Sequence, residues 1–232
     1  MKRLSFIAFI LIVMSSFLCA QDNQDWANLK RFQEENKKLG KQTPDSYSPR
    51  VVFMGNSITE GWLGQSPEYF TKNTSYINRG ISGQTSPQML LRFRQDVVQL
   101  EPNVVVILAG TNDIAGNTGP STLEMIQNNI ASMCEIAEAN GIDVVLCSIL
   151  PAYDFPWKTG LEPADKIKKM NQWIKEYASV NEWMYVDYYS ALVDERGGLP
   201  SKYSGDGVHP NKAGYAIMEH ILEQALENFS IE

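Results

Sequence analysis

The chain is poor in the residues that build metal centres and disulfide frameworks. Its 232 residues include two histidines and three cysteines. One usable histidine and cysteines on separate buried elements give a weak basis for a metal site. Cys134 falls on a predicted helix and Cys147 on a predicted central strand. We therefore expect two buried thiols that pack as small apolar groups, not a disulfide.

Long apolar runs are also missing, except at the beginning of the chain. Lys2 and Arg3 precede a mostly apolar run over residues 4–14, and small or polar residues lead to Gln21. This layout predicts a secretory signal peptide over residues 1–20, cleaved before Gln21, and a secreted or periplasmic protein without stable membrane insertion. A lipoprotein acylated on Cys19 is the weaker alternative, because a bulky leucine precedes that cysteine.

Positive charge is scarce and is not clustered. The formal net charge is −7, and removal of Lys2 and Arg3 with the signal peptide takes it to −9. An acidic chain without a basic cluster argues against nucleic acid and anionic membrane surfaces as partners. The expected partner is a small molecule or a glycan.

Residues 21–49 are predicted to form a helix, Trp26 to Lys38, followed by a linker that ends at Pro49. From Arg50 onward, short apolar runs alternate with segments of helical period, which indicates one domain over residues 50–232. Runs that do not alternate strictly with polar residues are typical of strands buried on both faces of a parallel sheet. The predicted strands are Val51–Met54, Ser75–Ile77, Val104–Ala109, Ile142–Leu150 and Trp183–Val186.

The segments between these strands carry one apolar stripe each and are predicted to be helices. Ser121 and Glu124 form a capping box before one helix, which Asn140-Gly141 ends. A second helix follows Pro163, and the last covers about Lys212 to Asn228. Strand–helix alternation predicts an α/β fold, a three-layer α/β/α sandwich. Ligands of such folds bind beyond the carboxyl ends of the strands.

Ser57 follows the first predicted strand, at the beginning of a helix. There its hydroxyl projects from a turn, and its own N–H can face the group that the hydroxyl attacks. On this feature alone, a serine that caps the helix or a turn that binds an anion is the favoured interpretation.

Two more loops carry candidate donors. Gly80 and Gly83 follow the second run and allow the backbone to approach a ligand closely, although on this feature alone an ordinary turn before a helix capped by Thr85 or Ser86 is favoured. Asn112 follows the third strand, where its amide can donate to a developing oxyanion or hold its own loop.

His209 lies in a loop three residues after Asp206, whereas His220 lies on the last helix, away from its apolar stripe. A hydrolase that needs an imidazole base must therefore use His209. The spacing allows the Asp206 carboxylate to hold one ring nitrogen while the other faces a serine. Together the four loops supply a nucleophile, a base, its orienting partner and three donors, which is the set that acyl transfer requires.

These residues resemble the motif blocks of the SGNH hydrolases, also called GDSL esterases/lipases. The blocks occur in the family's order and cover nearly the whole chain after the linker, and the stretch 78–83 is similar to the branch of platelet-activating-factor acetylhydrolase. The matching segments are Gly55-Asn56-Ser57-Ile58, Gly83, Gly110-Thr111-Asn112-Asp113 and Asp206-Gly207-Val208-His209-Pro210.

The resemblance implies a flavodoxin-like sheet of five parallel strands in the order 2-1-3-4-5, and no cofactor. It implies Ser57 as nucleophile, His209 as base and Asp206 as its partner. It also implies an oxyanion hole made by the N–H groups of Ser57 and Gly83 and the side chain of Asn112. One departure is Asn56, which stands where the family usually has an acid.

Aromatic residues near these loops suggest a substrate. A secreted esterase with aromatic rings among polar groups suits acetylated carbohydrate, although the same rings can simply pack their loop onto the body. The candidates for substrate contact are Trp62, Tyr153, Phe155 and Trp157.

Three alternatives remain at this stage. One is a lysophospholipase or thioesterase on the same residues, and another is a non-catalytic glycan-binding module. The third, a nucleotide-binding protein, lacks the Gly-x-Gly-x-x-Gly motif after the first strand.

Overall fold

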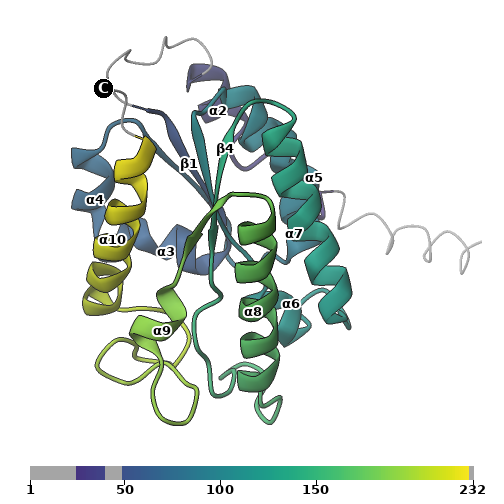
Figure 1. Ribbon diagram of the computed structural model, residues 1–232, viewed down its shortest axis with the longest axis vertical. Helices are drawn as coiled ribbons and strands as arrows, with labels where there is room; N and C mark the ends of the chain where they lie inside the picture. Colours follow the sequence, from purple (N-terminus) through teal and green to yellow (C-terminus); the bar gives the residue numbers. More distant parts are fainter. Residues whose placement is uncertain (1–24, 40–48, 230–232) are drawn as a thin grey trace, which may run out of the picture.

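The computed structural model describes residues 25–39 and 49–229. A five-stranded, fully parallel sheet with the order β2-β1-β3-β4-β5 lies between two layers of helices (Figure 1). The predicted fold class and strand order are therefore confirmed. β1 pairs with both β2 and β3, so the order of the strands reverses beside it, and the carboxyl end of β1 is where a ligand is expected.

The strands are short, and their core residues are those that the apolar runs predicted. The exception is the second strand, predicted over Ser75–Ile77, which continues to Gly80. Its polar end is buried, and Asn78 there satisfies its side chain by donating to the carbonyl oxygen of Thr59 at 2.6 Å. The strands are β1 (Val51–Gly55), β2 (Tyr76–Gly80), β3 (Val104–Leu108), β4 (Asp143–Cys147) and β5 (Met184–Val186).

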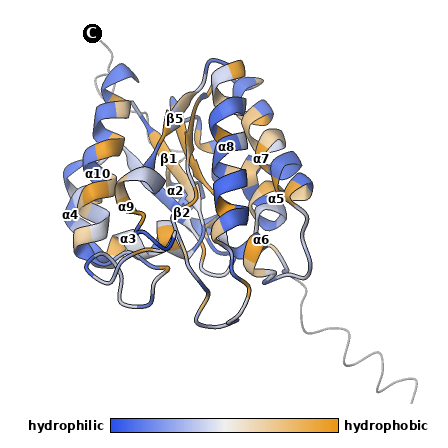
Figure 2. Cartoon of the chain, turned by 60° about the horizontal axis from the view of Figure 1, so that its bottom comes forward, coloured by the Kyte–Doolittle hydropathy of each residue, from blue (hydrophilic) through white to orange (hydrophobic). Residues whose placement is uncertain are grey.

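Helices cover both faces of the sheet. One face carries α5 (Ser86–Asp96), α7 (Leu123–Glu138) and α8 (Ala164–Val180), and the other carries α3 (Ser57–Gln65), α4 (Pro67–Lys72), α9 (Tyr188–Leu192) and α10 (Lys212–Leu226). Figure 2 shows apolar strands between helices whose outer surfaces are mostly hydrophilic. The remaining helices are α2 (Gln33–Leu39), α6 (Thr111–Ala115), η1 (Val98–Leu100) and η2 (Glu227–Phe229).

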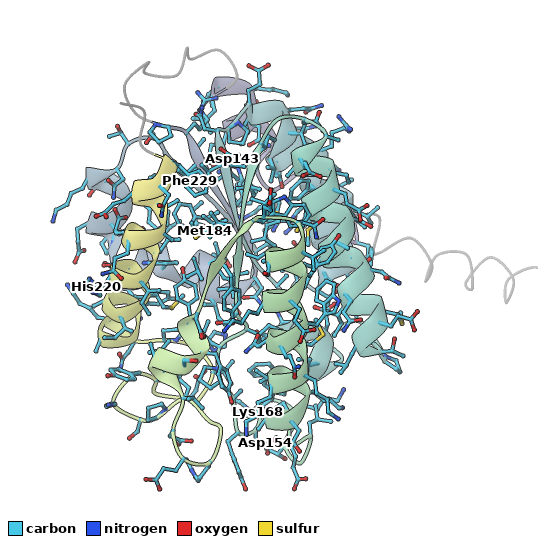
Figure 3. The ribbon with its side chains drawn as sticks, in the orientation of Figure 1. Asp143, Asp154, Lys168, Met184, His220 and Phe229 are labelled. Carbon is cyan, nitrogen blue, oxygen red and sulfur yellow. The ribbon has the colours of Figure 1, made fainter. Side chains whose placement is uncertain are left out.

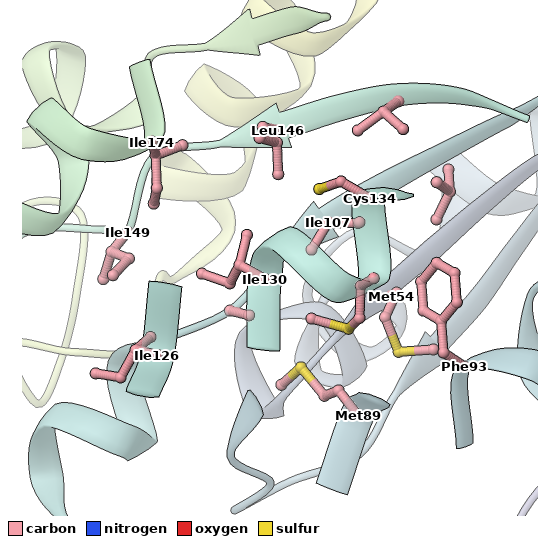
Figure 4. Packing of buried hydrophobic residues seen from close by; sticks show 14 of the residues in the cluster. Met54, Met89, Phe93, Ile107, Ile126, Ile130, Cys134, Leu146, Ile149 and Ile174 are labelled. Atoms are coloured by element: carbon pink, nitrogen blue, oxygen red, sulfur yellow. The ribbon is translucent and has the colours of Figure 1, made fainter. Parts of the chain in front are cut away.

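Alternate residues of each strand feed two separate cores. In β1, Val52 and Met54 pack toward α5 and α7, whereas Val51 and Phe53 pack toward α3 and α10. The first core includes the methionine, isoleucine and cysteine side chains seen in Figure 4. Cys134 and Cys147 are buried free thiols, as expected. The position of a residue along its strand therefore decides which of the two helix layers its side chain packs against.

Two helix ends differ from the prediction. The cap of α7 is Thr122, not Ser121, because the Thr122 hydroxyl accepts from the backbone N–H of Met125 at 3.1 Å. The predicted Ser121–Glu124 capping box is therefore wrong by one residue. The last helix begins at Lys212 as predicted, but its α-helical part ends at Leu226 and continues as η2.

The predicted helix from Trp26 to Lys38 is largely wrong, since only Gln33–Leu39 is α-helical. Asn28 has a φ of 54°, which interrupts a right-handed helix. The Asp25 carboxylate instead accepts from the N–H groups of Leu29 and Lys30, at 2.6 and 3.0 Å, and closes a turn. The predicted signal peptide and most of the linker lie outside the described residues.

No helix within 25–39 or 49–229 combines the length and the apolar character that crossing a bilayer demands. Figure 3 gives the polarity of the sheet: Asp143, at the start of β4, and Asp154, in the loop after it, lie at opposite ends of the molecule. The loops that follow the strands gather at the end marked by Asp154.

Candidate active site

Ser57 is the first residue of α3, directly after β1. Gly55 ends the strand, and the Asn56 side chain caps the helix by accepting from the N–H of Ile58 at 2.9 Å. The capping role considered for Ser57 thus belongs to Asn56, and the half-buried Ser57 hydroxyl is left for another partner. The first N–H groups of a helix lack intrahelical acceptors, so the Ser57 N–H is suited to an anionic oxygen.

That partner is His209, 152 residues later. Ser57 Oγ lies 2.9 Å from His209 Nε2, and His209 Nδ1 lies 2.6 Å from Asp206 Oδ2. We call this chain of hydrogen bonds the triad. A carboxylate at Nδ1 favours the tautomer with hydrogen on Nδ1, which leaves Nε2 to accept the serine proton. His220 is exposed on the outer side of α10 and takes no part (Figure 3).

Local hydrogen bonds shape the loop that carries the imidazole. Asp206 Oδ1 accepts from the backbone N–H groups of Val208 and His209 at 2.9 and 2.8 Å. The buried Ser204 hydroxyl donates to the carbonyl oxygen of His209 at 2.7 Å. The short spacing between Asp206 and His209 is therefore sufficient to fix both the ring and its orienting carboxylate.

Asp206 is held in its charged form. Partial burial acts to raise its pKa, but the hydrogen bonds from the His209 ring and from the N–H groups of His209 and Val208 outweigh burial and lower the pKa to about 2. The carboxylate is consequently ionised near neutral pH and can stabilise an imidazolium beside it.

The end of β2 comes close to the first turn of α3, which begins at Ser57. A Cβ on Gly80 would lie 2.1 Å from the backbone nitrogen of Glu60, so only glycine permits this approach of β2 to α3. Gly83 adopts a φ of 78° and turns the loop after β2. The buried Asn112 side chain donates to the carbonyl oxygen of Gln84 at 2.9 Å, which ties the loop after β3 to this one. Asn112 thus holds a neighbouring loop, not its own.

Asp113 joins the same two loops. Its buried carboxylate accepts from the backbone N–H of Ser86 at 3.0 Å and from the Ser86 hydroxyl at 2.5 Å. Burial raises the Asp113 pKa, and these hydrogen bonds oppose the rise. A carboxylate at the N-terminus of α5 also complements the helix dipole.

Arg92 is a buried residue that the sequence reasoning missed. From the inner face of α5 it donates to the carbonyl oxygen of Gly55 at 3.0 Å and to the Gln84 side chain at 2.6 Å. It also pairs with Asp96 at 3.1 Å, and both side chains have no exposed surface. Arg92 therefore links the residue before Asn56 to the loop that contains Gly83. Its place on an apolar stripe with Met89 and Phe93 was the signal in the sequence that Arg92 is buried.

Contacts between α10 and α3 hold His209 near Ser57. The Tyr215 hydroxyl donates to the carbonyl oxygen of Ile58 at 2.6 Å. Trp62 Nε1 donates to Glu219 at 2.9 Å, and its ring stacks on Tyr69 and is 2% exposed. The expectation that Trp62 contacts substrate is therefore wrong, because its ring belongs to the core between these helices.

The aromatic loop after β4 divides into core and surface residues. Phe155 is fully buried and stacks against Trp157, so its ring mainly packs the loop, although the residue also lines the hollow described below. Trp157 is 44% exposed, with its ring centroid 6.0 Å from that of His209. Tyr153 is 52% exposed and, with Asp206, lines a hollow of about 230 Å³. Trp157 and Tyr153 therefore remain open to a substrate.

Within residues 25–39 and 49–229, no group of three or more histidine, cysteine, aspartate or glutamate side chains is arranged to hold a metal ion. The arrangement that the site does offer is a hydroxyl, an imidazole and a carboxylate in a row, beside a helix N-terminus and a buried amide. Such a set is suited to nucleophilic attack on a carbonyl group.

Similar proteins agree with this chemistry. The chain is 49% identical to a GDSL-like lipase from Bacteroides thetaiotaomicron, whose crystal structure superposes with a TM-score of 0.84 over 88% of this chain and 98% of that one. An esterase from Pseudomonas aeruginosa, TesA, is 26% identical over 160 residues, 68% of this chain and 73% of the relative.

An acetylxylan esterase from Xylanibacter ruminicola is 24% identical over 221 residues, which are 79% of this chain but 44% of that longer protein. The model of the GDSL-like lipase/acylhydrolase family matches residues 53–217, and this stretch contains all four motif blocks. The chain belongs to the GDSL-like lipase/acylhydrolase family and, as a member of it, is a carboxylic ester hydrolase.

Proposed function

We propose that this protein removes short acyl groups, above all acetyl groups, from carbohydrate through a Ser57–His209–Asp206 mechanism. The observation that carries the proposal is the pair of distances in the triad, 2.9 Å from Ser57 Oγ to His209 Nε2 and 2.6 Å from His209 Nδ1 to Asp206. Both lie in the range that general-base activation of a serine requires.

The first half of the reaction forms an acyl-enzyme. Ser57 Oγ attacks the ester carbonyl carbon as His209 Nε2 takes its proton, and the tetrahedral intermediate places negative charge on the former carbonyl oxygen. The N–H groups of Ser57 and Gly83 and the amide of Asn112 stabilise that oxyanion. His209 then protonates the leaving alcohol, and the acyl group remains on Ser57.

The second half repeats these steps with water. His209 takes a proton from water as the water oxygen attacks the acyl carbon, and the same donors stabilise the second oxyanion. Collapse returns the proton to Ser57 and releases the carboxylic acid. Asp206 keeps the ring oriented and balances the imidazolium charge in both halves.

Two observations support a short acyl group on a sugar. A relative that shares 24% identity is named an acetylxylan esterase. The exposed rings beside the triad, Trp157 and Tyr153, are amphipathic surfaces of the kind that suit sugar rings. A preference for the long-chain esters of lysophospholipids, or for thioesters, would redirect the proposal to another substrate.

The test is a substrate panel assayed with wild type and Ser57→Ala in parallel. The panel contains acetylated xylotriose, 4-nitrophenyl esters of two to twelve carbons and a lysophospholipid. We expect the acetyl substrates to be hydrolysed fastest and Ser57→Ala to lose turnover and fluorophosphonate labelling. Preference for the long esters would overturn the substrate, and full activity of Ser57→Ala would overturn the mechanism.

The proposal includes export of the protein, which depends on the sequence of residues 1–20 alone. Mass spectrometry of the mature protein from its native host should give an N-terminus at Gln21. A mass that corresponds to acylated Cys19 would instead support a lipoprotein.

A further inference from the structure

A hollow of about 460 Å³ opens between residues 25–28 and the loops after β2 and α6. Its size falls within the range of about 300–1,000 Å³ typical of small-molecule sites, and it is larger than a short acyl chain requires. Trp26 and Asn28 lie on one side of it, Gly83 on a second, and Asn117 and Thr118 on a third. We call this space the N-terminal hollow.

The N-terminal wall of the hollow is built into the fold. Three glutamine side chains donate to its backbone: Gln88 to the carbonyl oxygen of Trp26 at 2.6 Å, Gln84 to that of Ala27 at 2.7 Å and Gln95 to that of Leu29 at 2.6 Å. Ala27 and Phe32 are buried beneath the segment, at 3% and 6% exposure. Hence the segment that precedes the domain is a fixed part of its surface.

The hollow adjoins the triad on the side of the proposed oxyanion donors. Gly83, whose N–H is one of those donors, lines it. Asn117 also lines it and accepts from Trp157 Nε1 at 3.1 Å, and the Trp157 ring lies 6.0 Å from that of His209. Gly83 and Asn117 are therefore the residues that connect the hollow to the candidate site.

The lining favours a neutral polyol over a phosphate. Trp26 is 43% exposed and offers an aromatic surface, while Asp25, Asn28, Asn117 and Thr118 offer hydrogen bonds. The residues that line the hollow, all in the described part of the chain, include one carboxylate and no lysine or arginine. A phosphate group would meet the Asp25 carboxylate and no cation among the lining residues, whereas sugar hydroxyls can donate to that carboxylate.

We propose that the N-terminal hollow binds the sugar part of the substrate, with Trp26 as its aromatic platform. The inference rests on the proposed function, because it assigns the alcohol side of the ester to this space. It also assigns substrate selection in part to residues 25–28, which precede the domain that begins at residue 50.

The test compares a sugar ester with a simple ester in the same variants. In Trp26→Ala, kcat/KM for acetylated xylotriose should fall about tenfold, mainly through KM, while 4-nitrophenyl acetate turnover stays within about twofold of wild type. Asn28→Gly should act in the same direction, since glycine accepts the φ of 54° that Asn28 adopts.

Leu29→Ala is the matched control. Leu29 belongs to the same segment and is 39% exposed, but it does not line the hollow, so both substrates should be unaffected. A second readout is independent of turnover: calorimetric binding of acetylated xylotriose to Ser57→Ala should weaken about tenfold when Trp26→Ala is added.

The two proposals fail in different ways. Unchanged kcat/KM and unchanged binding in Trp26→Ala would overturn the sugar subsite and leave the esterase mechanism intact. An equal loss on both esters would also overturn it, because a general loss of structure or reactivity is not a binding effect. Retained turnover in Ser57→Ala would overturn the mechanism itself.

Discussion

The two sides of the triad are built in different ways. On the donor side, Arg92 and Asp96 have no exposed surface and link Gly55 to Gln84 by hydrogen bonds inside the protein. On the base side, the side chains of His209 and Asp206 are 38% and 40% exposed and are held within one short loop. The groups proposed to move protons are partly exposed to solvent, whereas the groups that hold the proposed oxyanion donors are buried.

The largest effect should come from the exposed side. His209→Ala removes the proposed base and should lower kcat for 4-nitrophenyl acetate by about 10⁴-fold or more, with little change in the free energy of unfolding, because the ring is partly exposed. Initial rates and urea denaturation of the same samples measure both. A fall of less than tenfold in kcat would mean that another group acts as base.

Arg92→Met tests the buried side and should affect stability first. The change leaves Asp96 buried without its cation, which should cost about 3–5 kcal/mol in the free energy of unfolding, measured by urea denaturation. Adding Asp96→Leu should recover most of that stability, since a buried ion pair is replaced by apolar groups of similar volume.

Activity then separates positioning from stability. The double variant still lacks the donor to the carbonyl oxygen of Gly55 and to Gln84, so kcat should stay reduced although the protein is stable. Recovery of wild-type kcat in the double variant would show that Arg92 has no positioning role.

Asn112→Ala tests one donor that the buried side holds in place. Loss of one oxyanion donor typically costs about 3 kcal/mol of barrier, so kcat should fall about 10²-fold with a much smaller change in KM. Because Asn112 also bonds to Gln84, Asn112→Asp is a useful companion: it retains the size of the side chain but offers no amide hydrogen. Equal kcat in wild type and both variants would remove Asn112 from the proposed oxyanion hole.

The smallest effect concerns Asn56. Its side chain caps α3, so Asn56→Ala should cost about 1 kcal/mol of stability, whereas Asn56→Asp, which restores the residue usual in the family, keeps an acceptor for Ile58 N–H and should cost less than half of that. Thermal unfolding of the three proteins measures the order. A larger loss for aspartate than for alanine would contradict the capping role.

That the residues of the candidate site lie together was largely predictable, because most of them follow strands and apolar runs reveal strands. Ser57, Asn112, Asp206 and His209 were located by their position after such runs or by the scarcity of histidine. What the pattern could not give is the partner of each side chain across the fold. Trp62 illustrates this limit, since its hydrogen-bond acceptor, Glu219, is 157 residues away.

The N-terminal segment, residues 25–32, was predicted wrongly because its hydrogen-bond partners are also distant in sequence. Local propensity favoured a helix from Trp26, but three glutamine side chains from the loop after β2 and from α5 bind its backbone carbonyl oxygens and hold it in turns. Hydrogen bonds to distant side chains thereby override the helical preference of the segment. Arg92 was missed for a related reason, because one buried arginine on an apolar stripe has no local signature of its role.

The hydrogen bond from Tyr215 to Ile58 has a consequence for the order in which the enzyme matures. Ser57 follows the first strand, whereas His209 stands just before the last long helix, so we expect the two side chains to meet only once that helix has docked on α3. A chain that has completed its sheet but not this final contact would hold Ser57 without its proposed base. We therefore expect esterase activity to appear late in refolding. The time at which activity appears would report when α10 docks on α3.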